Sequence, residues 1–374
     1  MTRASDTAKL LGAGGSILGS LDIGGGQIGG RRNFVINGAM NVAQRATSVT
    51  GIGASSGYFT LDRFTIATGS SAGRLTMTQT ADGPNGFANC LKLDCTTADA
   101  SIAAGENMIL QHRFEGQDVQ AIGKGVTGAK EVTLSFYVKA NAAFDFVAEL
   151  NDHDNGRTNG RIFSTTTDWV RHEITFQADV DDGSSPFDDD NAKSLSINFW
   201  LHAGTTYTSG TLASTWENLT SANRAAGIDS FYSSTDNNFF ITGVQLELGS
   251  QATPFEHRSF GEELALCQRY YEVTGAGQPA KANSTTGIWV GFQFKTQKRA
   301  APSIALTAVN QRFFEFGVAN RDASNASIQQ TYLTTKSCLL RIEGYSGITA
   351  GDSYLSGGLV SDSTADTFIS ESEL

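Results

Sequence analysis

Charged side chains are scarce in this sequence. Of its 374 residues only 17% are Asp, Glu, Lys or Arg, and 27 basic against 38 acidic residues give a formal net charge of −11. Soluble domains usually have roughly a quarter of their residues charged, so we expect a surface rich in Ser, Thr, Asn, Gln and Gly. A negative chain without a basic stripe is a poor candidate for a nucleic-acid-binding protein, because such proteins neutralise phosphates with clustered Lys and Arg.

Long hydrophobic runs are missing too. No apolar stretch approaches the ~20 residues that a membrane-spanning helix needs. The first residues are broken by glycine and lack the apolar core of a secretory signal. We therefore expect no membrane insertion.

Proline and cysteine are rare, with 5 and 4 residues, whereas glycine (41) and phenylalanine (23) are abundant. The glycines have no three-residue period, which excludes collagen, and this composition is typical of a large all-β protein with many tight turns. The cysteines form no CxxC pair and no set of zinc ligands. We expect buried free thiols and synthesis in a reducing cytoplasm; the four are Cys90, Cys95, Cys267 and Cys338.

Residues 1–32 form a glycine-rich segment, with nine glycines between Gly12 and Gly30. Such a stretch cannot bury enough apolar surface to fold alone. It is either a flexible leader or a segment that becomes ordered on a partner. Isolated apolar residues favour the partner, and the candidate attachment residues are Leu10, Leu11, Ile17, Leu18, Leu21 and Ile23.

From residue 33 onward, strand-like runs alternate with turns rich in Gly, Asn, Asp and Ser. In residues 132–139 every second side chain is apolar, as it is in residues 197–202. Such one-sided strands predict two sheets that cover each other, so we expect a sandwich over residues 33–258. The runs are Phe34–Asn37, Phe59–Ala67, Leu75–Gln79, Leu91–Cys95, Met108–Phe114, Val132–Lys139, Phe144–Leu150, Trp169–Phe176, Leu195–Leu201 and Asn238–Leu246.

One helix is well signalled, over residues 259–276. Ser259 and Glu262 have the spacing of a capping box, and an apolar stripe continues through Leu264 and Cys267 to Tyr271. The helix either joins two β-domains or packs near the axis of a trimer. Residues 277–374 are again strand-like and predict a second, smaller β-sandwich.

No motif for catalysis or metal binding has the flanking structure that it needs. The GxGxxG match at Gly24 precedes a strand-like run instead of a helix, and the GxSxG match around Ser55 lacks the strand and helix of a nucleophile elbow. No two carboxylates suggest a glycosidase pair, and no histidines have ligand spacing. We expect no enzyme activity, no cofactor and no metal site. The acidic loop around Asp188 is either a solvated loop or a cation site.

Aromatic side chains are the remaining candidates for binding, because their apolar faces can stack on sugar rings. Trp169 and Trp200 lie in strand-like runs, which favours core packing. The candidate glycan-binding residues are Tyr207, Trp216, Tyr345 and Tyr354.

Two long strings resemble the module of bacteriophage tail-fibre and related virion structural proteins. They are NFVINGAMNVAQRATS (33–48), followed by YFTLDRF (58–64), and FITGVQLELGSQATPFEHRSFGEELALCQRYYE (240–272). Three strings resemble strands of a carbohydrate-binding-module jelly roll: VTLSFYVKA (132–140), TDWVRHEITF (167–176) and FFITGVQLELG (239–249). The long shaft of many fibres is absent, and residues 273–374 are covered only weakly.

The resemblance implies a homotrimeric short tail fibre or spike in the virion, assembled in the host cytoplasm. Its N-terminal segment would attach to tail or other virion proteins, and its C-terminal tip would bind host surface polysaccharide. Several weak sites on one oligomer would then act together through avidity. Two alternatives stay open: a capsid decoration or head-fibre protein, and a polysaccharide depolymerase.

Overall fold

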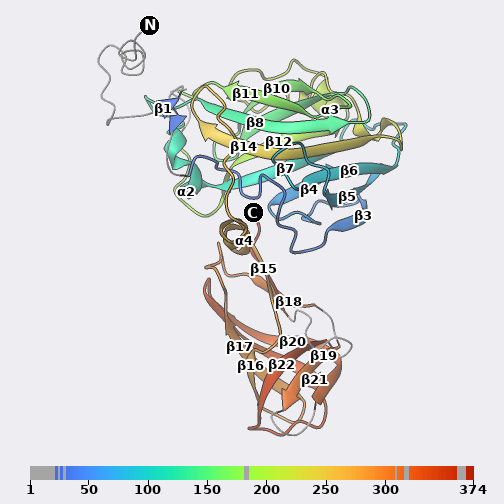
Figure 1. The fold of residues 1–374 in the computed structure, drawn as a ribbon, viewed down its shortest axis with the longest axis vertical. Coiled ribbons are helices and arrows are strands. Elements are labelled where there is room, and N and C mark those ends of the chain that lie inside the picture. Colours follow the sequence, from blue (N-terminus) through green and yellow to red (C-terminus); the bar gives the residue numbers. More distant parts are fainter. Residues whose placement is uncertain are drawn as a thin grey trace. The chain divides into compact units, whose positions relative to one another are not determined.

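The computed structural model describes residues 22–23, 26–27, 31–180, 185–307, 310–315, 320–359 and 368–374. The chain divides into two compact units (Figure 1). We call residues 1–41 and 47–257 the sandwich unit, and residues 42–46 and 258–374 the barrel unit. Strands predominate in both units, which confirms the all-β class.

Two six-stranded antiparallel sheets form the jelly roll of the sandwich unit. The first sheet has the order β13-β10-β9-β12-β7-β4, and the second has the order β11-β8-β14-β6-β5-β3. The first sheet contains β4 (Phe64–Gly69), β7 (Asn107–Glu115), β9 (Asp145–Asp152), β10 (Arg157–Ser164), β12 (Lys193–Ala203) and β13 (Glu217–Asn218). The second contains β3 (Ser48–Ile52), β5 (Arg74–Thr80), β6 (Cys90–Thr97), β8 (Val132–Ala140), β11 (Val170–Phe176) and β14 (Asn238–Leu248).

Short elements complete this unit. β1 (Asp22–Ile23) pairs with β2 (Gly26–Gln27) as a small antiparallel ribbon. The helical turns are α2 (Gly116–Val119), η1 (Gln120–Ile122), α3 (Thr205–Thr208), η2 (Ser221–Asn223) and η3 (Phe231–Ser233).

The alternating strands do bury their apolar faces between the two sheets. On β8 the side chains of Leu134 and Phe136 are fully buried, as are Ile197 and Phe199 on β12. The Phe136 ring packs edge-on against Phe199, with 5.0 Å between centroids. This confirms the sandwich core predicted from the period-two pattern.

Residues 33–40 were expected to begin with a strand. They instead run alongside β14 without regular secondary structure. The Asn33 side chain donates to Val244 O (3.2 Å) and accepts from Leu246 N (3.1 Å), and Phe34 N donates to Leu246 O (2.9 Å). The pairing of β14 with β8 shifts register between Thr242 and Gln245. At this irregular part of β14, the Asn33 side-chain amide makes hydrogen bonds of the kind that a neighbouring strand would make.

Trp169 is not in the core, which corrects the expectation for this residue. It is half-buried, and its ring packs against Phe240 (6.3 Å) and lies under Lys139 Nζ (5.2 Å). Trp200 is buried as expected.

In the barrel unit, α4 (Phe260–Gln268) begins with the predicted capping box at Ser259 and Glu262. The helix is shorter than predicted, because Tyr271 lies in a strand. β15 (Tyr271–Thr274), β23 (Phe368–Glu371) and β18 (Ser303–Leu306) form a three-stranded sheet.

The other strands of this unit close into a barrel, where the sequence predicted a second, smaller β-sandwich. In barrel order they are β16 (Pro279–Ala282), β17 (Gly287–Gln293), β21 (Ser337–Tyr345), β20 (Asn320–Leu333), β19 (Gln311–Glu315) and β22 (Ser353–Leu359). Each of these six described strands pairs with a neighbour on both sides, so the barrel has no free edge of the kind that an open sheet must cover.

All four cysteines are free and buried, as predicted. Burial raises the pKa of Cys90 and Cys95 to about 11 and that of Cys338 to about 12. Among the described residues, no helix is both long enough and apolar enough to cross a membrane.

Candidate functional site

An exposed aromatic pair lies on the outer face of the barrel. Trp289 on β17 and Tyr332 on β20 flank the intervening strand β21, and their ring centroids are 5.8 Å apart at 37° between planes. The Tyr332 side chain is 62% exposed, and Trp289 is half-buried. Neighbouring aromatic side chains that stay accessible on a surface are candidates for a binding site.

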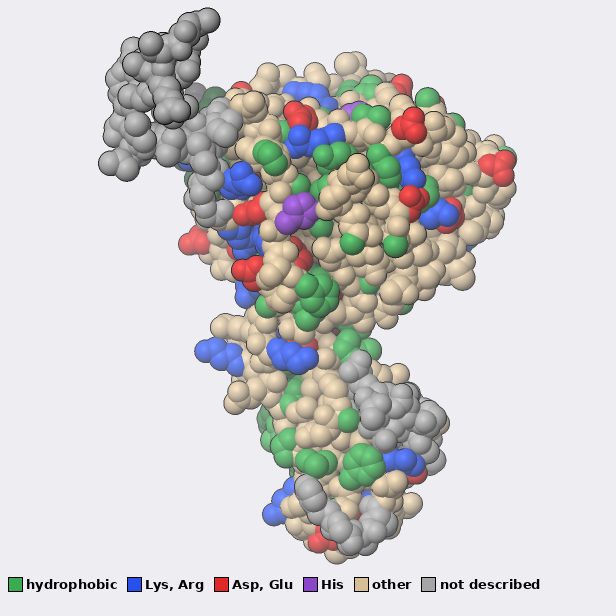
Figure 2. Space-filling view, in the orientation of Figure 1, with side chains coloured by type: hydrophobic (Ala, Val, Ile, Leu, Met, Phe, Trp, Pro, Cys, Tyr) green, Lys and Arg blue, Asp and Glu red, His purple; other side chains and the backbone are tan. Residues whose placement is uncertain are grey.

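The strand register explains why these rings meet. Trp289 pairs with Arg341, and Tyr332 pairs with Leu339, so all four side chains point to the same outer face. The alternate residues of these strands fill the barrel core. Leu339 is 42% exposed and extends the apolar surface beside Tyr332. We call Trp289, Tyr332 and Leu339 the aromatic platform. Hydrophobic side chains are also present on the face of the barrel unit that Figure 2 shows.

Polar groups border the aromatic platform. Arg341 forms an ion pair with Glu343 two residues along the same strand. Thr286 Oγ1 donates to Glu343 Oε2 at 2.8 Å. The Asn283 amide forms hydrogen bonds through both its nitrogen and its oxygen in one of its two orientations. In that orientation the nitrogen donates to Gly287 O at 2.8 Å, and the oxygen accepts from Arg341 Nε at 3.1 Å. Apolar ring faces beside fixed hydrogen-bonding groups match a sugar ring, which has C–H faces and hydroxyl edges.

A second polar arrangement covers the outer face of the first sheet, around the buried carboxylate of Glu149. Asn198 Nδ2 (2.7 Å) and Trp200 Nε1 (2.9 Å) donate to Oε2, and Thr158 Oγ1 (2.5 Å) donates to Oε1. Arg224 donates to both oxygens at 2.8 Å. Burial alone would raise the pKa of Glu149, but Arg224 and these hydrogen bonds hold it below its ordinary value.

The network continues across the sheet. Gln111 on β7 donates to Asn198 Oδ1 at 2.6 Å, and Ser196 Oγ donates to the same oxygen at 3.0 Å. His153 contacts Ser196 Oγ at 2.9 Å. Burial, with the positive charges of Lys193 and Arg113 nearby, lowers the pKa of His153 to about 3. The polar groups of these side chains form hydrogen bonds with one another, so the network stabilises the sheet.

Residues 204–230 cover the apolar half of this face. The Tyr207 ring packs on Trp200 with 5.2 Å between centroids, and the Arg224 guanidinium lies over the same indole at 4.8 Å. Tyr207, a candidate glycan-binding residue, is therefore half-buried against Trp200.

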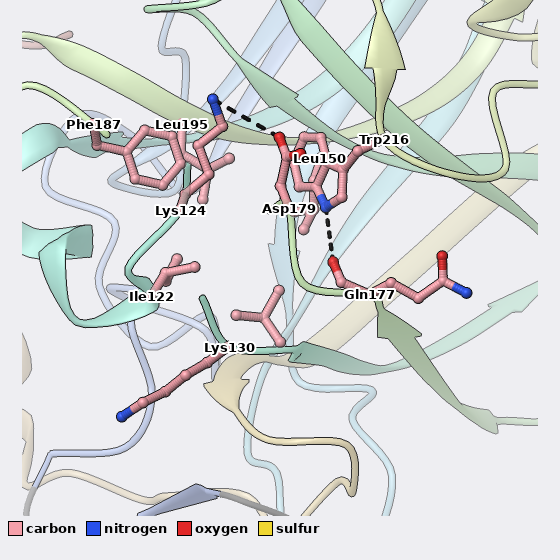
Figure 3. Close-up of a pocket in the computed structure, with 10 residues that line it drawn as sticks. Ile122, Lys124, Lys130, Leu150, Gln177, Asp179, Phe187, Leu195 and Trp216 are labelled. Carbon is pink, nitrogen blue, oxygen red and sulfur yellow. Dashed lines mark hydrogen bonds and ion pairs between the residues drawn. The ribbon is translucent and has the colours of Figure 1, made fainter. Parts of the chain in front are cut away.

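Trp216 lies at one end of the sandwich, where it closes a small cavity (Figure 3). Its Nε1 donates to Gln177 O at 2.8 Å. The cavity volume is ≈ 10 Å³, about the space that one water molecule needs, so no sugar ring fits there. Figure 3 shows Ile122, Leu150, Phe187, Leu195, Lys124, Lys130 and Asp179 around it.

Tyr345 and Tyr354 are not surface residues, which corrects their assignment to a glycan site. They are 2% and 1% exposed and belong to the barrel core. The Tyr345 ring packs edge-on against Phe313 at 5.2 Å. A buried ring cannot stack on a sugar, and the accessible platform on this unit is instead Trp289 and Tyr332.

The candidate attachment residues of the N-terminal segment lie almost entirely outside the described residues. Leu10, Leu11, Ile17, Leu18 and Leu21 lie outside the described residues, and for Ile23 only the strand assignment in β1 is described.

A group of potential metal ligands, which sequence spacing did not indicate, lies in the sandwich unit. One ligand atom each from Asp99, Glu106 and His202 lies within 4.8 Å of the others. The loop from β6 to β7 supplies the two carboxyls and β12 supplies the imidazole. The histidine is about a hundred residues from the acids in sequence, so no local motif could reveal the group.

The fold and these surfaces define a class, an all-β protein with a jelly-roll sandwich. Neither a known protein family nor a curated protein matches the sequence. Among solved structures it is similar to one described as "CBM4 structure and function", with 13% identity, a TM-score of 0.29, and 57% of this chain and 97% of that chain covered.

Two further solved structures are similar at the same level. The enzymatically active domain of tailspike protein 4 of bacteriophage CBA120 has 12% identity and a TM-score of 0.30, with 58% of this chain and 21% of that chain covered. The family 11 carbohydrate-binding module of a Clostridium thermocellum cellulosomal cellulase has 14% identity and a TM-score of 0.27, with 57% and 99% covered.

Proposed function

We propose that this protein is a non-catalytic glycan-binding component of a bacteriophage particle, a short tail fibre or spike. The observation that carries glycan binding is the pair of accessible rings, Trp289 and Tyr332, over β21. Their exposed surface could stack on the C–H face of a sugar, and Arg341 and Glu343 beside them could form hydrogen bonds with its hydroxyl groups.

The virion assignment is supported by the resemblance of residues 33–48 and 240–272 to phage tail-fibre and virion modules. In this proposal residues 1–32 attach the chain to a tail protein, the chain forms a homotrimer, and the barrel unit binds host surface polysaccharide. Three weak platforms on one particle component raise the apparent affinity through avidity without any stronger single contact.

Binding of the full chain to purified host surface polysaccharide tests the glycan site. Trp289→Ala and Tyr332→Ala should each weaken binding about tenfold, which corresponds to the loss of roughly 1.4 kcal/mol of contact free energy. Trp169→Ala, a half-buried aromatic of the sandwich unit, is the matched control and should bind like the wild type. Unchanged binding by both platform variants would refute this site.

The other parts of the proposal have separate readouts. Static light scattering at micromolar concentration should give three times the chain mass, and a monomer would refute the trimer. Immunogold labelling on the capsid instead of the tail would favour the decoration protein. Release of reducing ends from the polysaccharide would favour the depolymerase.

A further inference from the structure

We propose that Asp99, Glu106 and His202 form a binding site for a divalent transition-metal ion of the zinc type. The three side chains are buried, and their ligand atoms all lie within 4.8 Å of one another. The site is independent of the aromatic platform, which lies in the other unit of the chain.

The strongest indication is a buried imidazole nitrogen without a partner. His202 is 0% exposed, and its Nε2 has no hydrogen-bond partner. Nε2 lies 3.8 Å from Glu106 Oε2, too far for a hydrogen bond. An unpaired buried polar atom costs free energy, and an ion bound between these groups would remove that cost.

The other nitrogen of this ring is already held. Nδ1 of His202 and Ser230 Oγ are 2.8 Å apart. If Nδ1 carries the proton and donates it to the hydroxyl, the lone pair of Nε2 points toward the two carboxyls. This is the arrangement of metal-binding histidines, whose second nitrogen donates to a neighbouring group that orients the ring.

Backbone donors hold both carboxyls in place. Asp99 accepts from Ser101 N (3.2 Å) and Ala72 N (3.3 Å), and Glu106 accepts from Ala103 N (3.0 Å). The strand pairing of β7 with β12 sets His202 beside Glu106, because Gly204 N donates to Glu106 O at 2.8 Å. The ligands are therefore oriented before any ion arrives, which lowers the entropy cost of binding.

The two acids have no basic partner. Among the described residues, no Lys or Arg forms an ion pair with Asp99 or Glu106. A divalent cation bound between the two carboxyls would supply the counter-charge that no Lys or Arg provides.

The ligand set indicates the kind of ion. Ca²⁺ and Mg²⁺ prefer oxygen ligands alone, whereas imidazole nitrogen with carboxylate oxygen suits Zn²⁺ and related ions. Ligand atoms around a tetrahedral zinc ion, at ~2.0–2.2 Å from the metal, are roughly 3.3–3.6 Å apart. Binding would draw the three atoms, which lie within 4.8 Å of one another, to that spacing. A bound ion would tie the loop before β7 to the end of β12.

Titration of the chelator-treated full chain with ZnCl₂ in a calorimeter tests the site. We expect one Zn²⁺ per chain and a rise in the melting temperature when Zn²⁺ is present. Glu106→Gln keeps the side-chain shape and should weaken binding more than about tenfold, as should His202→Gln. His172→Gln is the control, because His172 is a half-buried strand histidine outside the group.

Near-ultraviolet circular dichroism shows whether each variant is folded. If His202→Gln fails to fold, Glu106→Gln alone decides, together with the visible spectrum of the Co²⁺-loaded wild type, which reports nitrogen coordination. A wild type that binds no Zn²⁺, or a folded Glu106→Gln that binds it unchanged, would overturn the site. Tighter binding of CaCl₂ than of ZnCl₂ would overturn the assignment to a zinc-type ion.

Discussion

The guanidinium of Arg224 donates two parallel hydrogen bonds, each 2.8 Å long, to the carboxylate of Glu149. Arg224 belongs to the segment 204–230, and Glu149 lies on β9, so this pair attaches the covering segment to the first sheet. Glu149 is completely buried and has no other cationic partner within hydrogen-bond distance among the described residues.

Arg224→Ala should therefore destabilise the sandwich unit strongly. It leaves a buried carboxylate without its counter-charge, which typically costs about 3–5 kcal/mol. Urea denaturation followed by circular dichroism measures the loss. Adding Glu149→Gln to Arg224→Ala removes the unpaired charge and should restore part of the stability.

A surface pair in the same unit provides the control. Lys92 and Asp94 form an ion pair at 2.9 Å, with about a third of each side chain exposed. Asp94→Ala should change stability by at most about 1 kcal/mol, because exposed ion pairs contribute little. Equal losses for Arg224→Ala and Asp94→Ala would contradict the importance of burial.

Acid should weaken the sandwich unit partly through His153. Its pKa is lowered from 6.5 to about 3 in the folded protein. Between these values the unfolded chain binds a proton that the folded chain does not, so stability falls as the pH is lowered from 6.5 toward 3. His153→Gln should flatten this dependence by at most about 1.4 kcal/mol per pH unit. Denaturation midpoints measured every half pH unit test this, and parallel curves for the two proteins would count against it.

Two tyrosines of the barrel should respond in opposite ways to truncation. Tyr345→Ala removes a buried ring beside Phe313 and should cost about 3–5 kcal/mol, as other large-to-small core changes do. Tyr332→Ala removes an exposed ring and should leave the melting temperature nearly unchanged while it weakens glycan binding. If Tyr345→Ala kept its stability but no longer bound glycan, Tyr345 would be a glycan-binding residue and not a core residue.

Gly38 is required by a close backbone approach. A Cβ added there would lie 2.1 Å from Val244 O, at the irregular part of β14. The hydrogen bond from Val244 N to Gly38 O (3.0 Å) holds the two backbones at this close distance. Gly38→Ala should therefore destabilise the sandwich unit by about 1–3 kcal/mol. Thermal unfolding measures this, and a melting temperature equal to that of the wild type would contradict the crowding.

The four thiols should be unreactive until the protein unfolds. Each is buried, and the thiolate, which is the reactive form, is disfavoured at Cys90, Cys95 and Cys338 by their raised pKa. A thiol reagent at pH 8 should modify none of them in the native chain and all four in denaturant. Rapid native labelling of any one would show that its surroundings open.

The sequence by itself determined the parts of the fold that depend on neighbouring residues. Alternation placed Leu134, Phe136 and Phe199 in the sandwich core, because side chains along a strand alternate between its two faces. The Ser259 and Glu262 spacing located the start of α4, since a capping box is closed within one helical turn. The rarity of charge and the wealth of glycine and aromatic residues indicated an all-β protein.

Only the tertiary structure decided which side chains meet and which are exposed. Trp289 and Tyr332 become neighbours through the register of two strands on β21, and Glu106 and His202 become neighbours through the pairing of β7 with β12. Tyr345 resembles a surface tyrosine in sequence, but closure of the barrel buries it. Pairing register and barrel closure depend on contacts between segments that are distant in the sequence, so local sequence patterns do not predict them.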